Sequence, residues 1–154
     1  MGNFIDTGIG TISGKDHRLE AGYDAFAFSY QQTRFTEDDV EEGENSQLRI
    51  KQSYLKWRLP SSDAVFEIDF GLGLYEIKGE EVNQGLAITA PILFHPSSNF
   101  GVELRPSYSS DKVTDVELSF ITGWDFVKFK AGVRWINVDG ASLDNVFAGL
   151  IFVL

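Results

Sequence analysis

The chain has no cysteine, so neither a disulfide framework nor a thiolate metal site can form. No apolar run approaches the roughly 18 residues of a transmembrane helix, and no window shows the three- and four-residue apolar spacing of an amphipathic helix. Basic residues do not cluster along the sequence, and the formal net charge is −10, so little is present to neutralise nucleic-acid phosphates. These absences argue against disulfide-rich, helical membrane and nucleic-acid-binding proteins.

The sequence instead alternates with a period of two. In the last twelve residues one parity is entirely apolar: Val146, Ala148, Leu150, Phe152 and Leu154. Nearly every upstream segment repeats this alternation, while the opposite parity carries single charges and glycines instead of the polar coat of a soluble half-buried sheet. This pattern predicts an all-β, antiparallel, up-and-down transmembrane β-barrel with lipid outside and a polar, charged lumen.

The length of 154 residues fits one domain, and we expect a single β-barrel domain over 1–154. Alternation predicts eight strands, at 26–35, 47–59, 64–77, 84–94, 99–109, 115–125, 127–137 and 144–154. A further hairpin, 3–12 and 17–23 around a turn at 13–16, gives ten strands, an even number as in bacterial single-chain barrels, although eight remain possible. Short turns and longer polar loops alternate, which places both termini at the short-turn rim.

Two local features disturb the strand pattern. Leu48 and Ile50 share one parity whereas Leu55 and Trp57 share the other, so we expect a bulge near Gln52–Tyr54. Pro91 and Pro106 interrupt predicted strands and indicate bulges or rim positions, because proline cannot donate to the ladder.

The inward parity balances its charges. We assign nine acids to it: Asp6, Glu20, Asp24, Glu67, Asp69, Glu103, Asp115, Glu117 and Asp125. We assign nine bases: Arg18, Arg49, Lys51, Lys56, Arg58, Arg105, Lys128, Lys130 and Arg134. Charges in a narrow interior of low dielectric constant require partners. We therefore predict a lumen ion-pair network of Arg49, Lys51, Glu67, Asp69, Glu103, Arg105, Glu117, Lys128, Lys130 and Arg134 in a largely plugged barrel.

Aromatic residues make up 14% of the chain, and several fall on the outward parity near predicted strand ends. They are Tyr54, Trp57, Tyr108, Trp124, Phe126 and Trp135. This placement is similar to the aromatic girdles of membrane barrels.

The C-terminal alternation resembles the terminal strand of bacterial outer-membrane barrels. That class usually ends in Phe, whereas this chain has Leu154, with Phe152 two residues earlier. The stretch 131–137 with its following Gly-containing loop also resembles the YfaZ-type outer-membrane proteins. The resemblance implies a porin-like protein in a Gram-negative outer membrane, its signal peptide removed, with the bilayer and lipopolysaccharide as partners. It implies a monomer and supplies no activity.

Catalytic constellations are poorly supported. Asp16 and His17 could face Asp38 and Asp39, as in omptin-like proteases, but adjacent residues of a strand point to opposite faces. The run 95–99 is similar to the His-x-Ser-Asn motif of lipid A deacylases, with its spacing off by one. We expect no enzymatic activity and no cofactor.

An acidic run is the remaining local feature. Its carboxylates are those of Glu37, Asp38, Asp39, Glu41, Glu42 and Glu44. They could gather Ca²⁺ or Mg²⁺ through oxygen ligands, but the spacing is not that of an EF-hand, so a solvated loop is the simpler interpretation. Such a loop could also attract a cationic partner.

Our leading hypothesis is a non-enzymatic outer-membrane β-barrel that acts through acidic external loops or a narrow, largely plugged lumen. Two alternatives stay open. A soluble lipocalin-like barrel would line a ligand pocket with the apolar parity. An outer-membrane hydrolase would use His17 with Asp16.

Overall fold

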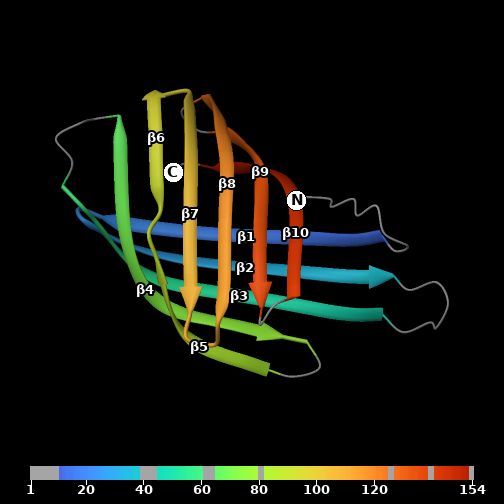
Figure 1. Ribbon diagram of the computed structural model, residues 1–154. Helices are drawn as coiled ribbons and strands as arrows, with labels where there is room; N and C mark the ends of the chain where they lie inside the picture. Colours follow the sequence, from blue (N-terminus) through green and yellow to red (C-terminus); the bar gives the residue numbers. More distant parts are fainter. Residues whose placement is uncertain are drawn as a thin grey trace.

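The computed structural model describes residues 11–38, 45–60, 65–79, 82–124, 127–138 and 141–152. Within these ranges the chain forms ten antiparallel strands of one sheet and no helix (Figure 1). The strands are β1 Thr11–Tyr23, β2 Phe26–Asp38, β3 Asn45–Arg58, β4 Phe66–Lys78, β5 Val82–Thr89, β6 Ile92–Ser97, β7 Phe100–Ser109, β8 Val113–Trp124, β9 Val127–Val138 and β10 Ala141–Phe152.

The strands follow one another in chain order, except that β5 and β6 share one position in the sheet. Both lie between β4 and β7. They are separated at Ala90 and Pro91, where the ring removes a backbone donor, although the Pro91 carbonyl still accepts from the Asp69 amide at 2.9 Å. The predicted strand 84–94 is thus interrupted at its proline, as expected.

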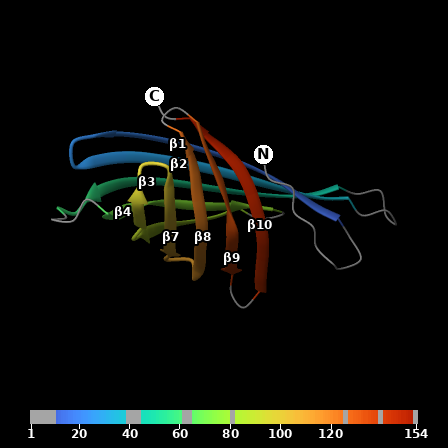
Figure 2. The ribbon, with the colours of Figure 1, turned by 90° about the horizontal axis from the view of Figure 1, so that it is seen from above.

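The sheet is strongly curved and barrel-like. In two views at right angles, β1 to β3 run across one side while β7 to β10 cover the other (Figures 1 and 2). Contacts join the two sides through the interior: Arg18 of β1 reaches Glu103 of β7, and Arg134 of β9 donates to Thr33 of β2 at 2.8 Å. We call the side of the sheet that faces this interior the inner face, and the other the outer face.

The N-terminal hairpin prediction is wrong. Strand β1 continues through 13–16, with Gly14 opposite Phe35 and Lys15 opposite Arg34. The reason is that β2 extends to Asp38 and offers a pairing partner along the whole of β1, so no turn is needed. The chain thus reaches ten strands by a different division from the predicted one. Most of the predicted strand 3–12, and both chain termini, lie outside the described residues.

The connections define the two ends of the sheet. The β2–β3, β4–β5, β7–β8 and β9–β10 connections lie at one, which we call the long-loop end, and the β1–β2, β3–β4, β6–β7 and β8–β9 connections lie at the other, which we call the short-turn end. Strands β1 and β10 both run from the long-loop end to the short-turn end. No pairing joins them within the described part of the chain.

The expected bulge in β3 is also absent. Its register against β2 and β4 is unbroken, so one parity faces inward throughout and buries Ile50, Gln52, Tyr54 and Lys56. Ile50 follows that parity because the long-loop end of the interior is itself apolar. Three predictions fail as a result: Arg49 and Lys51 lie on the outer face, and Tyr54 is buried instead of joining an outer girdle.

The inner face changes character along the strands. Towards the long-loop end it holds an apolar cluster, formed by Phe35, Ile50, Tyr54, Tyr75, Ile77, Ala87, Val113 and Ile136, with Leu48, Val138, Leu143 and Phe147 packed against it. Elsewhere the buried side chains are mostly polar or charged. Glycine makes room for side chains on this face: a Cβ on Gly71 would lie 2.7 Å from Thr89 Cγ2 and 3.1 Å from Lys56 Cγ.

Over most of its area the outer face is apolar, where a soluble protein would be polar. Its exposed large side chains include Leu55, Trp57, Phe70, Leu72, Leu86, Phe120, Phe129, Trp135, Val146 and Leu150. The predicted outward alternation of the final strand is confirmed for Val146 and Leu150. Of the predicted aromatic set, Trp57, Tyr108, Trp124 and Trp135 are exposed, and Phe126 lies outside the described residues.

Candidate functional site

The charged part of the interior is built around Lys130 of β9. Its ammonium lies 2.6 Å from Glu103 of β7 and 2.5 Å from Glu117 of β8. Glu117 also accepts from Arg105 at 2.5 Å. These side chains are all at least 90% buried, so both signs are removed from water and held by one another. Adjacent strands supply the pairs because inward residues of β7, β8 and β9 lie side by side.

A chain of further pairs carries this network across the interior to β4. Arg18 of β1 contacts Glu103 at 3.2 Å and Glu20 at 3.0 Å. Glu20 in turn accepts from the nearly fully buried Lys56 of β3 at 2.7 Å. Lys56 also lies 3.4 Å from Asp69 of β4. The ion pairs therefore link β1, β3, β4, β7, β8 and β9.

The short-turn end of the network lies on β3, β4 and β6. Arg58 contacts Asp69 at 3.1 Å and Glu67 at 3.0 Å. His95 Nε2 lies 3.0 Å from Glu67 Oε1, an ion pair only when the imidazole is protonated. Its geometry is not that of a hydrogen bond.

A second cluster surrounds Asp115, closer to the apolar cluster. Arg134 donates to both carboxylate oxygens, from Nε at 2.9 Å and from Nη2 at 2.5 Å, in a bidentate pair. Gln52 and Tyr75, from the opposite side of the interior, also donate to Asp115. On the same inner face, Asp16 accepts from Gln31 and Thr33 at 2.8 Å each. The carboxylates here have several donors apiece, as buried charge requires.

The predicted network residues divide into three groups. Ion pairs join Glu67, Asp69, Glu103, Arg105, Glu117, Lys130 and Arg134 in the interior. Lys128 is half-buried on the inner parity and has no ion pair with another described residue. Arg49 and Lys51 are on the outer face, where Lys51 pairs with Glu76 at 2.8 Å. Asp6 and Asp125 lie outside the described residues.

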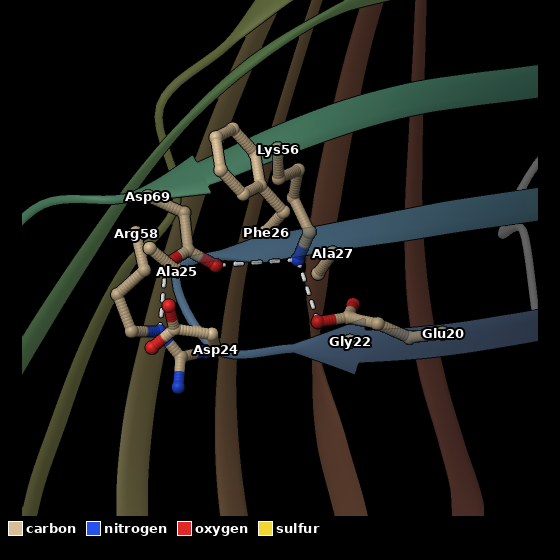
Figure 3. A pocket seen from close by; sticks show the side chains of 9 residues that line it. All are labelled: Glu20, Gly22, Asp24, Ala25, Phe26, Ala27, Lys56, Arg58 and Asp69. Carbon is tan, nitrogen blue, oxygen red and sulfur yellow. Dashed lines mark hydrogen bonds and ion pairs between the residues drawn. The ribbon is translucent and has the colours of Figure 1, made fainter.

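A small pocket opens beside the β1–β2 turn at the short-turn end (Figure 3). Its volume is about 260 Å³. It is lined by Glu20, Gly22, Asp24, Ala25, Phe26, Ala27, Lys56, Arg58 and Asp69. As Figure 3 shows, Lys56 lies between Glu20 and Asp69, and Arg58 also reaches Asp69. The pocket's cations are thus occupied by its own carboxylates.

The catalytic candidates do not assemble among the described residues. Asp16 points inward, whereas its neighbour His17 is exposed on the outer face. Asp38 ends β2, and Asp39 lies outside the described residues. In the run 95–99, His95 contacts Glu67, while Ser98 donates to Asn99 at 3.2 Å and not to the imidazole.

The acidic run is described only at its start, where Glu37 and Asp38 are the last two residues of β2. Asp39, Glu41, Glu42 and Glu44 lie outside the described residues. No group of three or more His, Asp or Glu side chains in the described ranges is arranged to hold a metal ion.

The sequence interpretation missed Asp16, Gln52 and Tyr75 as partners in the interior. A straight period-two register for β3 would have placed Gln52 inside. No local signal shows which residues meet across the interior, since Arg18 and Glu103 are 85 residues apart.

Searches of protein families, curated proteins and solved structures gave no match for this chain. No helix within the described ranges is long and apolar enough to span a membrane.

Proposed function

We propose that this chain is an integral outer-membrane β-barrel of a Gram-negative bacterium, a monomer without enzymatic activity. One observation carries the proposal: the sheet exposes its large apolar side chains and buries its ion pairs. Leu72 is 59% exposed and Leu86 72% exposed, whereas Lys56 is 3% exposed. In water this arrangement would leave a large apolar surface without cover. In a bilayer it is the favourable arrangement, with the apolar band against lipid.

The same observation favours this proposal over a soluble lipocalin-like carrier. A carrier of that kind lines its interior with the apolar parity to bind a hydrophobic ligand. Here the central interior is filled by Glu103, Glu117, Lys130 and their partners, and the pocket at the short-turn end is lined by charges. Neither offers a site for an apolar ligand.

The side chains that fill the interior favour a sealed barrel and argue against an open pore. Side chains fill small barrels, and aqueous channels appear only at about sixteen strands. In this chain two barriers lie in series: the apolar cluster at the long-loop end and the ion network nearer the short-turn end. The function is then carried by the external loops, including the acidic run 37–44, or by a narrow interior that passes at most water and small ions.

Refolding tests the proposal directly. The protein is diluted from urea into detergent micelles and, separately, into plain buffer, followed by circular dichroism and by gel mobility without boiling. We expect strand signal and a heat-dependent mobility shift only with detergent, and steady conductance in a planar bilayer far below that of an open porin. A soluble monomeric β-protein in plain buffer would refute the proposal.

A further inference from the structure

Four basic residues form a continuous row on the outer face, across β1 to β4. Lys15 is directly opposite Arg34, Arg34 is opposite Arg49, and Arg49 is opposite Lys78. Directly opposite residues on neighbouring strands have Cβ atoms about 5 Å apart, so the row spans roughly 15 Å. The sequence conceals this row, because its members lie far apart in a chain of net charge −10.

The row is exposed and lacks acidic partners. Lys15, Arg34 and Lys78 are exposed and Arg49 is half-buried. None of the four has a carboxylate within ion-pair distance among the described residues, and Glu76, in the next outward row, is already paired with Lys51. The partner of the Arg34 guanidinium is a neutral group. When the side-chain amide of Gln32 is turned so that its oxygen faces Arg34, that oxygen accepts from the guanidinium at 2.7 and 3.0 Å.

Four like charges placed directly opposite one another oppose the pairing of their strands. The sheet tolerates them where an external anion supplies the missing charge. A suitable anion carries more than one negative group over the length of the row, since a single group would reach only two adjacent side chains. Arginine is the better residue for phosphate, because its guanidinium binds two oxygens at once.

The position of the row along the strands favours an anion that belongs to a membrane lipid. Four residues further towards the short-turn end, the outward positions of β1 and β4 are the exposed Leu19 and Leu74, and Tyr30 and Ser53 lie at the same level on β2 and β3. Four residues of a strand span roughly 13 Å. The row thus lies beyond the apolar band, towards the long-loop end, with the polar outward row of His17, Gln32, Lys51 and Glu76 between them. This is the side of the lipid headgroups if the apolar band faces acyl chains.

We propose that Lys15, Arg34, Arg49 and Lys78 bind the phosphorylated headgroup of an outer-leaflet glycolipid of the lipopolysaccharide class. Arg34 and Arg49 contact the phosphates, and the two lysines extend the site at its edges. This inference rests on the proposed membrane barrel and deepens it, because it names the lipid that the outer face selects. The acyl chains of that lipid lie along the apolar outer surface of β1 to β4.

The test measures binding of bisphosphorylated lipid A to the full chain refolded in detergent micelles, by native mass spectrometry. The same lipid with both phosphates removed gives the comparison. Arg34→Gln and Arg49→Gln each remove one cation from the row, and Lys112→Gln is the matched control, since Lys112 is an exposed cation of the β7–β8 turn at the same end. We expect each arginine variant to bind lipid A at least about tenfold more weakly, with no change in the control.

Three results would overturn the inference: equal binding of the phosphate-free lipid, an equal loss in Lys112→Gln, or full displacement by excess inorganic phosphate. The last would show a site for soluble anions. Heat-dependent gel mobility of each variant shows whether the barrel has folded. If the barrel folds in detergent but the Arg34 and Arg49 variants bind lipid A as well as the unchanged protein does, this inference fails and the proposed function stands. If the chain folds as a soluble protein in plain buffer, the proposed function fails with it.

Discussion

The two faces of the same strands differ in the side chains that they bury and expose. On β4 the inner face buries Asp69 and Tyr75, whereas the outer face exposes Phe70 and Leu72. Sequence alternation is the same in a soluble and a membrane sheet, so alternation alone does not say which parity meets water. The difference is decided by where charged side chains find partners, and here every ion pair among the described residues except Lys51–Glu76 lies on the inner face.

The largest expected effect comes from breaking the inner network. Glu103→Gln leaves Lys130 and Arg18 with one fewer carboxylate in a buried setting, which should cost about 3–5 kcal/mol of unfolding free energy. Urea unfolding of the protein in lipid vesicles, followed by tryptophan fluorescence, measures it. Asp144→Asn, which changes an exposed outer carboxylate, is the control and should have little effect. Equal effects would remove the energetic distinction between the faces.

The next largest effect is expected from a charge introduced on the outer face. Phe120 lies near the middle of β8 and is 55% exposed, so Phe120→Arg should cost about 2–4 kcal/mol in a bilayer. Thr114→Arg, near the long-loop end of the same strand and outward, should cost about 0–1 kcal/mol. The same vesicle unfolding assay compares them. If both substitutions had the small effect of a soluble surface, within about 0.5 kcal/mol, the outer face would be in contact with water.

A smaller effect is expected when one methylene group is removed, and it should differ between the apolar cluster and the outer face. Ile136 is 1% exposed within that cluster, and Ile136→Val should cost about 0.5–1.5 kcal/mol because the packed interior does not refill the lost methylene. Ile88→Val, on the outer face, should cost less, since lipid chains adjust to the change. Denaturation midpoints in vesicles report both values. A larger loss at Ile88 would contradict a packed interior.

The smallest effect concerns the outer ion pair. Glu76→Gln removes the partner of Lys51, and because both side chains are about a quarter to a third exposed, the expected cost is under about 1 kcal/mol. A cost equal to that of Glu103→Gln would mean that inner and outer pairs are equally desolvated. The measurement uses the same unfolding assay at low and at high salt. High salt screens the exposed pair, so the difference in unfolding free energy between the unchanged protein and Glu76→Gln should be smaller there.

The sequence predicts the period-two strands and most inward charges because both depend on local parity. Neighbour pairing also follows, as for Glu117 with Lys130 on the consecutive strands β8 and β9. The prediction fails where distant strands decide. The prediction that Arg49 and Lys51 lie inside depends on a bulge in β3, whereas pairing with β2 and β4 keeps one register.

The turn expected at 13–16 fails for a similar reason. Gly14 and Lys15 have the composition of a turn, but the length of β2 decides that they pair in a strand. Contacts across the interior, such as Gln52 with Asp115, depend on the curvature of the whole sheet and leave no trace in local spacing. The basic row of the outer face was hidden by both of these errors, since it contains Lys15 and Arg49.

Tryptophan quenching tests most directly whether the outer face meets lipid. The chain has three tryptophans, and Trp57, Trp124 and Trp135 all lie on the outer face, at 48%, 79% and 43% exposure. The protein is refolded into vesicles of phosphatidylcholine with brominated acyl chains, and acrylamide is added as the aqueous quencher. We predict strong quenching by the bromine atoms and weak quenching by acrylamide. Strong acrylamide quenching with no effect of brominated lipid would contradict the inverted arrangement of the two faces.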